Sequence, residues 1–448
     1  MATRLLHSLT LCSLMATLSS CGTNDRLLTS QRAFRSGNIS GAAAMLASSA
    51  ARANPTSKDA VILKLEAGSM ATLAGNQAQG LELLKSADQA IEAANQRALI
   101  QLGREAGAMV SNLNSLPYVP SPSDQIMGAS YLALSFANQG QLSQARSAVK
   151  LAKNRQADVF AKYQSEIDRE RGAMDQARQR AQVPYNLDQA NLDHVSATIE
   201  ADLTQYAPYA NLSVPYAELI AGILLGCGAD AEPDRARESL TRALAASPGN
   251  NALALAAHGN LNGRLHLIIE SGVAPSLTEH SFHLPLFIGG RVTMLSAAYP
   301  RMQFHPLQAP VEIQVEGTRP NSFLVCDFDR IAAEHFRRRL PGIIARTTAA
   351  SVTKAVISYA AQQAAAQQSS DAALIAGLFG AVYNMASARA DLRIWATLPK
   401  QVSYANLALP ASGKLTVGGR DYRLEAGKTA IVRVREVNGQ SAVEITSL

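Results

Sequence analysis

The sequence lacks the motifs that would name a reaction. It contains no Gly-x-Ser-x-Gly nucleophile elbow, no P-loop and no glycine fingerprint for a dinucleotide. Aromatic residues make up only 5% of the 448 residues and Trp395 is the single tryptophan, so no aromatic platform for a sugar is evident. These absences leave the molecular activity open and favour a protein that is not an enzyme. We therefore predict no catalytic residues, no cofactor and no metal site.

A strong excess of charge of one sign is also missing. The chain carries 41 basic and 35 acidic residues, which gives a formal net charge of +6. This mild excess over a long chain is compatible with anionic partners such as lipid headgroups or cell-wall polymer. It is not the concentrated basic patch of a nucleic-acid-binding protein, so we expect no nucleic-acid partner.

A short apolar segment near the N-terminus leads into Leu18-Ser19-Ser20-Cys21. Arg4 is the one charge before it, and residues 9–18 are too short to span a bilayer, which takes about 20 apolar residues. The pattern is similar to the lipobox of bacterial lipoproteins, in which the cysteine is acylated and becomes the first mature residue. Residues 1–20 are therefore interpreted as a signal peptide and residues 21–30 as a lipidated tether. The alternative is an ordinary signal peptide that contains a cysteine.

Acylation of Cys21 implies a membrane partner, because two or more acyl chains anchor a protein stably. Gly22 is not an aspartate, which resembles an outer-membrane address under the enterobacterial sorting rule. The expected location is the cell envelope, with the protein lipid-anchored in the outer membrane and facing the periplasm. Besides Cys12 in the signal, the remaining thiols are Cys227 and Cys326, which either pair in an oxidising periplasm or stay apart as two buried thiols.

Residues 31–260 have the composition of helices, rich in Ala, Leu, Gln, Glu and Arg. A weak self-similarity repeats around Gly37, Gly75 and Gly140, and a fourth copy near Tyr216 has Gly222 before a longer glycine-containing turn; small and apolar residues follow the turns at spacings of three and four. Small residues let two antiparallel helices approach closely, and glycine lets the chain reverse. The pattern indicates an array of tetratricopeptide (TPR)-like repeats, and the alternative is a generic helical bundle.

Beyond residue 260 the pattern changes to short alternating segments that predict strands. They fall at 265–269, 281–287, 292–295, 311–315 and 323–325 within residues 261–326, and at 401–409, 414–417, 422–424, 429–437 and 441–448 within residues 396–448. Asn438-Gly439 between the last two is a strong hairpin signal.

Residues 327–395 predict a helical hairpin inserted between these strands, with a break at Pro341 and a second helix over 371–392. Its uncharged part, 372–388, is slightly short for a bilayer, so we favour a buried helix over a membrane span. The expected fold class is α+β: an N-terminal TPR-like helical array followed by a β-rich domain that carries a helical hairpin packed on its sheet.

Two motifs resemble those of a known family. They are Glu270-Ser-Gly-Val-Ala-Pro275, with Glu279 just after it, and Ala390-Asp-Leu-Arg-Ile-Trp-Ala-Thr-Leu-Pro399. With the lipobox and the order of elements, they make the chain similar to an uncharacterised family of bacterial TPR-like lipoproteins, often encoded beside lipoproteins that activate penicillin-binding proteins. The resemblance implies a role in the cell envelope by association and brings no catalytic residues. The motif residues, interpreted as structural, are Glu270, Gly272, Ala274, Pro275, Glu279, Asp391, Arg393, Trp395, Leu398 and Pro399.

Some of these polar residues also have chemical interpretations. His266, His280 and His283 are the cluster closest to a metal site, but residues 280 and 283 fall on opposite faces of a strand. Glu270 and Glu279 are candidates for paired carboxylates acting on a glycan. We predict structural roles for both groups, and we expect a buried Asp391–Arg393 pair beside Trp395 to fix the junction between hairpin and β domain.

The leading functional hypothesis is a non-enzymatic scaffold or adaptor of the envelope, possessing a concave repeat surface for an unknown envelope protein. One alternative is a peptidoglycan- or polysaccharide-processing enzyme that uses Glu270 or Glu279. Another is an export or pore component, with residues 342–392 entering the membrane.

Overall fold

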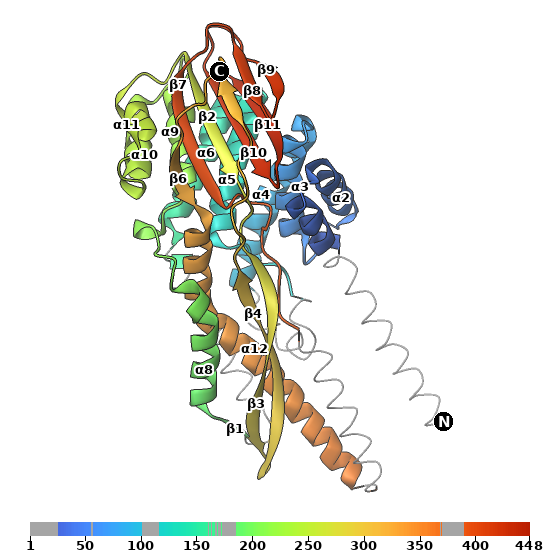
Figure 1. Cartoon of the computed structure of the whole chain (residues 1–448). Helices are drawn as coiled ribbons and strands as arrows, with labels where there is room; N and C mark the ends of the chain where they lie inside the picture. Colours follow the sequence, from blue (N-terminus) through green and yellow to red (C-terminus); the bar gives the residue numbers. More distant parts are fainter. Residues whose placement is uncertain are drawn as a thin grey trace.

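The computed structural model describes residues 26–54, 57–100, 116–159, 185–367, 369 and 389–448, with a few positions between 161 and 172. Helices fill the N-terminal part of these residues and strands dominate the C-terminal part, so the chain is a mixed α and β protein (Figure 1). The signal peptide and Cys21 lie outside the described residues.

Helices, several of which are joined in pairs by tight turns, form the N-terminal part. They are residues 26–35, α2 (Ile39–Arg52), α3 (Ala60–Leu73), α4 (Gln77–Ile100), α5 (Pro122–Asn138), α6 (Leu142–Ala157), α9 (Pro215–Gly226), α10 (Pro233–Ala246) and α11 (Asn251–His258). Gly37, Gly75 and Gly140 have positive φ in the turns between consecutive helices, as the sequence pattern predicts. Gly222 lies inside α9, where a Cβ would come within 2.3 Å of the Leu240 side chain of α10. That helix pair therefore requires glycine at this position.

A five-stranded sheet joins strands from both sides of the helical insertion, as expected. Its order is β11-β10-β2-β7-β6, formed by β11 (Gln440–Ser447), β10 (Ala430–Val437), β2 (Arg264–Ser271), β7 (Gln401–Ala408) and β6 (Phe323–Asp327). β2 and β10 are parallel and the other neighbours are antiparallel. Asn438 and Gly439 both have positive φ and form the predicted two-residue turn between β10 and β11.

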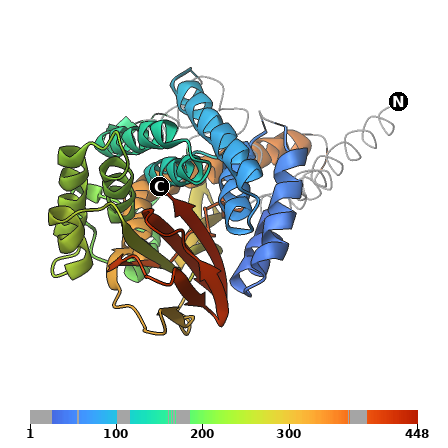
Figure 2. The same ribbon diagram turned by 90° about the horizontal axis from the view of Figure 1, so that it is seen from above.

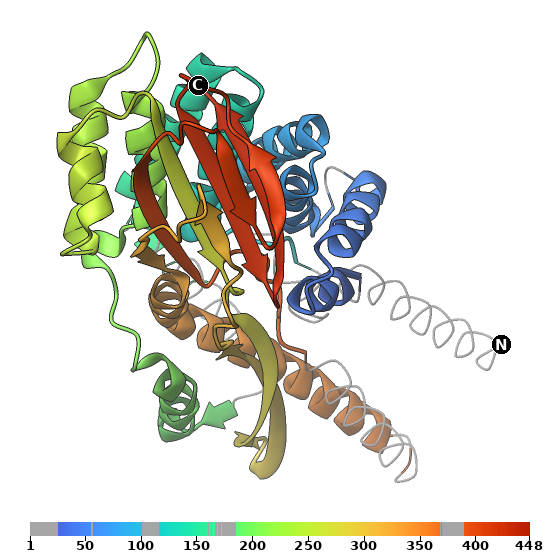
Figure 3. The ribbon, with the colours of Figure 1, turned by 45° about the horizontal axis from the view of Figure 1, so that its top comes forward.

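Both faces of this sheet are covered. Along β10, Ile431 and Val437 share a core with the helices, whereas Val432 and Val434 pack with a small sheet of β5 (Ile313–Val315), β8 (Lys414–Val417) and β9 (Arg420–Arg423). Figure 2 shows the helices curving around one side of the sheet, and Figure 3 shows the same sheet in front of them. The side of the helical array that we expected to receive a partner therefore holds the chain's own sheet.

The strands β3 (Ser276–Ile288) and β4 (Arg291–Gln303) do not join the five-stranded sheet. They form a long hairpin that pairs with β1 (Tyr185–Leu187), a strand not predicted from the sequence. One face of this second sheet shares a core with α8 (Gln189–Glu200) and α12 (Phe328–Ala366). These elements extend away from the main sheet (Figure 1), and we call β1, β3, β4, α8 and α12 the arm.

The helical insertion differs from its prediction in two ways. It packs on β4 rather than on the five-stranded sheet, because the apolar residues of α12 share their core with the inner face of the hairpin. It also continues through Pro341 without a break: Leu340 and Ile344 on either side are buried in that core, which compensates for the backbone hydrogen bond that proline removes.

The predicted boundaries at two other segments are also wrong. The chain is already helical from residue 26, with Leu27 only 2% exposed, so residues 26–30 belong to the first described helix and not to the tether predicted over residues 21–30. Of the predicted second helix over 371–392, residues 371–388 lie outside the described residues, and residues 389–392 are not helical. Ala390 and Arg389 in this last segment contact the Glu279 carboxylate of β3.

Candidate functional site

The two family-like motifs lie side by side in the structure. The backbone N–H of Ala274 donates to the carbonyl of Leu398 at 2.8 Å, and that of Lys400 donates to the carbonyl of Ser271 at 3.0 Å. Further along, the Glu279 carboxylate accepts a hydrogen bond from the backbone N–H of Ala390 at 2.8 Å. Tertiary structure thus joins motifs that are more than 100 residues apart.

Glu270 lies in the core between sheet and helices and is 0% exposed. Its Oε1 accepts a hydrogen bond from the Tyr216 hydroxyl at 2.7 Å, and its Oε2 is 4.0 Å from Nε of Arg435. Arg435 in turn donates to the carbonyls of Glu270, Thr397 and Leu398, so it connects the two motifs. Because Glu270 is enclosed and Glu279 binds Ala390, these positions give no support to a carboxylate pair acting on a glycan.

Sequence reasoning missed Arg435 and its neighbour Arg433. Arg433 forms an ion pair with Glu444 at 2.5 Å, and its guanidinium lies 4.9 Å from the ring centroid of Tyr131 in α5. The alternation of side chains along a strand could have identified them. On β10 the two arginines lie on the same face as Ile431 and Val437, which pack against the helices.

The expected Asp391–Arg393 pair is present and has a third member. The Arg393 guanidinium donates to both Asp391 oxygens, at 2.8 and 2.6 Å, and to Asp59 at the start of α3 at 2.8 Å. The Arg393 side chain is only 2% exposed. Nearby, the Trp395 indole donates to the Thr397 hydroxyl at 3.1 Å, and the ring packs edge-on against Tyr131.

Glu66 in α3 holds the same segment from the helix side and was not predicted. Its carboxyl group accepts hydrogen bonds from the Gln31 amide, the Ala396 backbone N–H and the Thr397 hydroxyl. Burial raises the pKa of Glu66 to about 7, although these donors act in the opposite direction. An acidic residue in a helix whose residues are mostly apolar was the signal that could have identified it.

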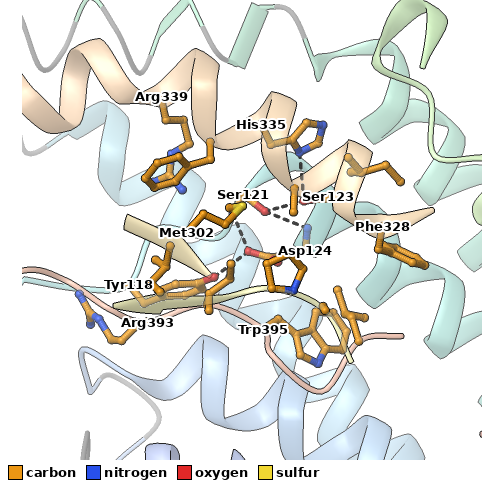
Figure 4. A pocket seen from close by; sticks show the side chains of 18 residues that line it. Tyr118, Ser121, Ser123, Asp124, Met302, Phe328, His335, Arg339, Arg393 and Trp395 are labelled. Carbon is orange, nitrogen blue, oxygen red and sulfur yellow. Dashed lines mark hydrogen bonds between the residues drawn. The ribbon is translucent and has the colours of Figure 1, made fainter. Parts of the chain in front are cut away.

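A cavity of about 80 Å³ lies where the arm meets the helices (Figure 4). Both motifs contribute to its wall, together with α5, α12 and the β3–β4 hairpin. Most of the lining is apolar or aromatic: Tyr118, Ala274, Pro275, Leu277, Met302, Phe328, Ile331, Ala332, Phe336, Ile394, Trp395 and Leu398. Concave, mainly apolar sites with a few polar groups are typical of ligand sites.

The polar groups of the cavity come mainly from the start of α5 and from α12. Asp124 accepts hydrogen bonds from the Tyr118 hydroxyl and the Ser121 backbone N–H, both at 2.7 Å. Burial raises the pKa of Asp124, while these donors and the nearby Arg339 lower it. Ser123 lies 3.0 Å from Nδ1 of His335.

The Ser123–His335 contact does not provide an activated nucleophile. Burial, with the neighbouring Arg339 and Arg338, lowers the pKa of His335 to about 3. A histidine with such a low pKa is a weak general base near neutral pH.

The other candidate side chains do not come together. His266 is buried in β2 beside Tyr404, whereas His280 and His283 lie in the arm on β3. Within the described part of the chain, no three His, Cys, Asp or Glu side chains are placed to hold a metal ion. Cys227 and Cys326 are two separate buried thiols rather than a disulfide.

The arm ends in an exposed apolar surface. Phe287, Val292 and Met294 are 49%, 59% and 59% exposed. Phe287 pairs with Val292 in the hairpin, and Met294 is two residues from Val292, so the three side chains share its outer face. We call them the tip patch. β4 is the last strand in the order β1-β3-β4, so no described strand covers its outer edge.

Comparison with known proteins finds no relative: no protein-family model, no curated protein and no solved structure matches the chain. The resemblance to TPR-like lipoproteins therefore rests on the motifs and stays a prediction. None of the described helices is long and apolar enough to cross a membrane, and residues 372–388 are outside that set.

Proposed function

We propose that this chain is a lipid-anchored envelope adaptor that binds a partner protein at the tip of its arm. The observation that supports it is the tip patch, in which three large apolar side chains lie together on one exposed face. Soluble proteins rarely expose such clusters unless another molecule covers them. The TPR-like helix pairs then serve as the frame that carries the sheet and the arm.

The edge of β4 suggests how the partner binds. An extended segment can add to an exposed strand edge, where main-chain hydrogen bonds supply affinity and alternate side chains supply specificity. We infer that an extended stretch of the partner pairs with β4 and covers the tip patch with alternating apolar residues. Burying the exposed parts of three such side chains contributes on the order of 2–4 kcal/mol.

A photo-crosslinking amino acid tests this surface. Placed at Val292 in the native envelope, it is expected to trap one protein repeatedly, identified by mass spectrometry. The matched control position is Leu255 on α11, which is 47% exposed and lies on the helical array. A crosslink from position 255 but none from 292 would show that the partner docks on the helices and would overturn the proposed surface.

The membrane anchor is tested by fractionation. With acyl chains on Cys21 as the anchor, the wild-type chain should stay with membranes through a carbonate wash, and a Cys21→Ala form should be released from them. The readout is the share of the protein in the pellet, measured by immunoblot. Retention of the Cys21→Ala form would contradict the lipid anchor and favour insertion by another segment, such as residues 342–392.

A further inference from the structure

The cavity between the arm and the helices has the features of a ligand site of its own. Its volume of about 80 Å³ exceeds the roughly 10–15 Å³ that one water molecule requires. Aromatic and aliphatic side chains from separate elements form most of the wall, among them Phe328, Phe336 and Trp395 (Figure 4). The space is therefore suited to an apolar group larger than water.

One carboxyl oxygen on this wall is open to a ligand. Asp124 lines the cavity and is only 4% exposed. Its Oδ2 accepts the hydrogen bonds from the Tyr118 hydroxyl and from the backbone N–H of Ser121. Its Oδ1 accepts none from the residues that the structure describes, although an ionised carboxylate can accept about four in total. Oδ1 is therefore the oxygen that remains to accept a hydrogen bond from a ligand.

Other polar groups of the wall are already engaged within the protein. The Ser123 hydroxyl lies 2.9 Å from that of Ser121 and 3.0 Å from Nδ1 of His335. The Arg393 guanidinium pairs with two carboxylates, and Arg339 also has interactions of its own. A ligand therefore meets an apolar wall whose open polar atom is a hydrogen-bond acceptor.

The charges around Asp124 favour a neutral donor over a cationic one. The nearby Arg339 carries a positive charge that acts on Asp124 and favours its ionised form. An ammonium ion in the same apolar space would place a second cation beside this guanidinium and would lose its hydration, at a high cost in free energy. A hydroxyl donates to a carboxylate in a strong, charge-assisted hydrogen bond and adds no charge.

We propose that this cavity binds a small neutral molecule with an apolar body and one hydroxyl group. The hydroxyl donates its hydrogen to Oδ1 of Asp124, and the body packs among the aromatic residues. A molecule that has only an acceptor oxygen turns it towards Oδ1, so both oxygens lose their water without gaining a hydrogen bond. This site is independent of the adaptor function, because it lies between the arm and the helices rather than at the tip patch.

Calorimetric titration of the full chain in lipid nanodiscs tests the proposal, with empty nanodiscs as the blank. The probes share one carbon skeleton: 2-butanol is a neutral donor, butanone has only an acceptor, and 2-aminobutane is a cation. We expect 2-butanol to bind at least about tenfold more tightly than either analogue, a difference of about 1.4 kcal/mol. Binding of 2-butanol no tighter than both analogues, or no binding of any probe, would overturn the proposal.

Two variants of lining residues locate the site. Asp124→Asn keeps an oxygen for Tyr118 and Ser121 and replaces Oδ1 with an NH₂ donor, so the preference for 2-butanol over butanone should disappear. Ala332→Leu fills the cavity from α12 and should weaken 2-butanol at least about tenfold, which provides the test if the first variant fails to fold. Asp188→Asn at the N-cap of α8 is the matched control and should keep the preference, since Asp188 does not line the cavity. An unchanged preference in folded Asp124→Asn, or an unchanged affinity in folded Ala332→Leu, would contradict the assignment.

Discussion

Replacing Arg393 with methionine is expected to destabilise the protein by about 3–5 kcal/mol, because it removes one partner of a buried ion cluster. Arg393 is the shared counter-ion of Asp59 and Asp391, and its own side chain is 2% exposed. Methionine fills similar space but leaves the buried Asp59 carboxylate and the partly exposed Asp391 carboxylate without their shared cation. The same change removes the contact between the motif segment and Asp59 at the start of α3, while the hydrogen bonds of Ala396 and Thr397 to Glu66 of α3 remain.

Chemical denaturation followed by circular dichroism measures this loss. Arg301→Met is the matched control: Arg301 also pairs with a carboxylate through two nitrogens, at 2.5 and 3.0 Å, but it is 38% exposed and Asp202 30%. An exposed pair of this kind contributes roughly 0–1 kcal/mol. Equal losses in the two variants would mean that burial of Arg393 does not determine its contribution.

We expect Glu66→Gln to change the free energy of unfolding in a way that depends on pH. Compared with the wild type, the variant gains stability as the pH rises from 4.5 to 8. The pKa of Glu66 is about 7 in the folded chain against an ordinary value of 4.5. The folded state therefore holds this proton more tightly than the unfolded state does. Its contribution to stability is complete below pH 4.5 and is lost as the pH rises through 7, by about 3 kcal/mol.

The measurement is the difference in unfolding free energy between variant and wild type across this pH range. Glutamine keeps an oxygen that accepts the hydrogen bonds of Gln31 and Ala396, but it cannot ionise. The unfolding free energy of the variant minus that of the wild type should therefore increase by about 2–3 kcal/mol between pH 4.5 and 8. Burial also raises the pKa of Asp329, to about 6. Because Asp329 titrates in both proteins, its contribution cancels in the difference between variant and wild type. Glu82→Gln, at an exposed position, is the control. If the stability difference between Glu66→Gln and the wild type did not change with pH, the prediction would be wrong.

Local sequence patterns predicted the local structure well. Glycine turns located the helix pairs because only glycine tolerates positive φ and close helix contact at these positions, as at Gly75 and Gly222. The alternation of apolar and polar residues predicted the strands. Asn438-Gly439 predicted the turn between β10 and β11, since both residues adopt positive φ at little cost. These features depend on neighbouring residues in the chain.

The cavity and its polar groups could not be predicted in the same way. Asp124, Arg339 and Trp395 come from segments far apart in the sequence and meet only because the arm folds against the helices. Pro341 shows the same limit: the local rule predicts a helix break, but burial of its neighbours against the hairpin overrides it.

By itself, the sequence determined the class of the fold, the order of helices and strands, the turns, and the two motifs, because propensity and periodicity act over a few residues. Only the tertiary structure decided that β3 and β4 leave the main sheet to form an arm, that the sheet fills the inner side of the helical array, and that Glu270 and Arg393 are enclosed. These outcomes follow from which apolar faces bury one another and which buried charges find partners, and both are settled by contacts between distant segments.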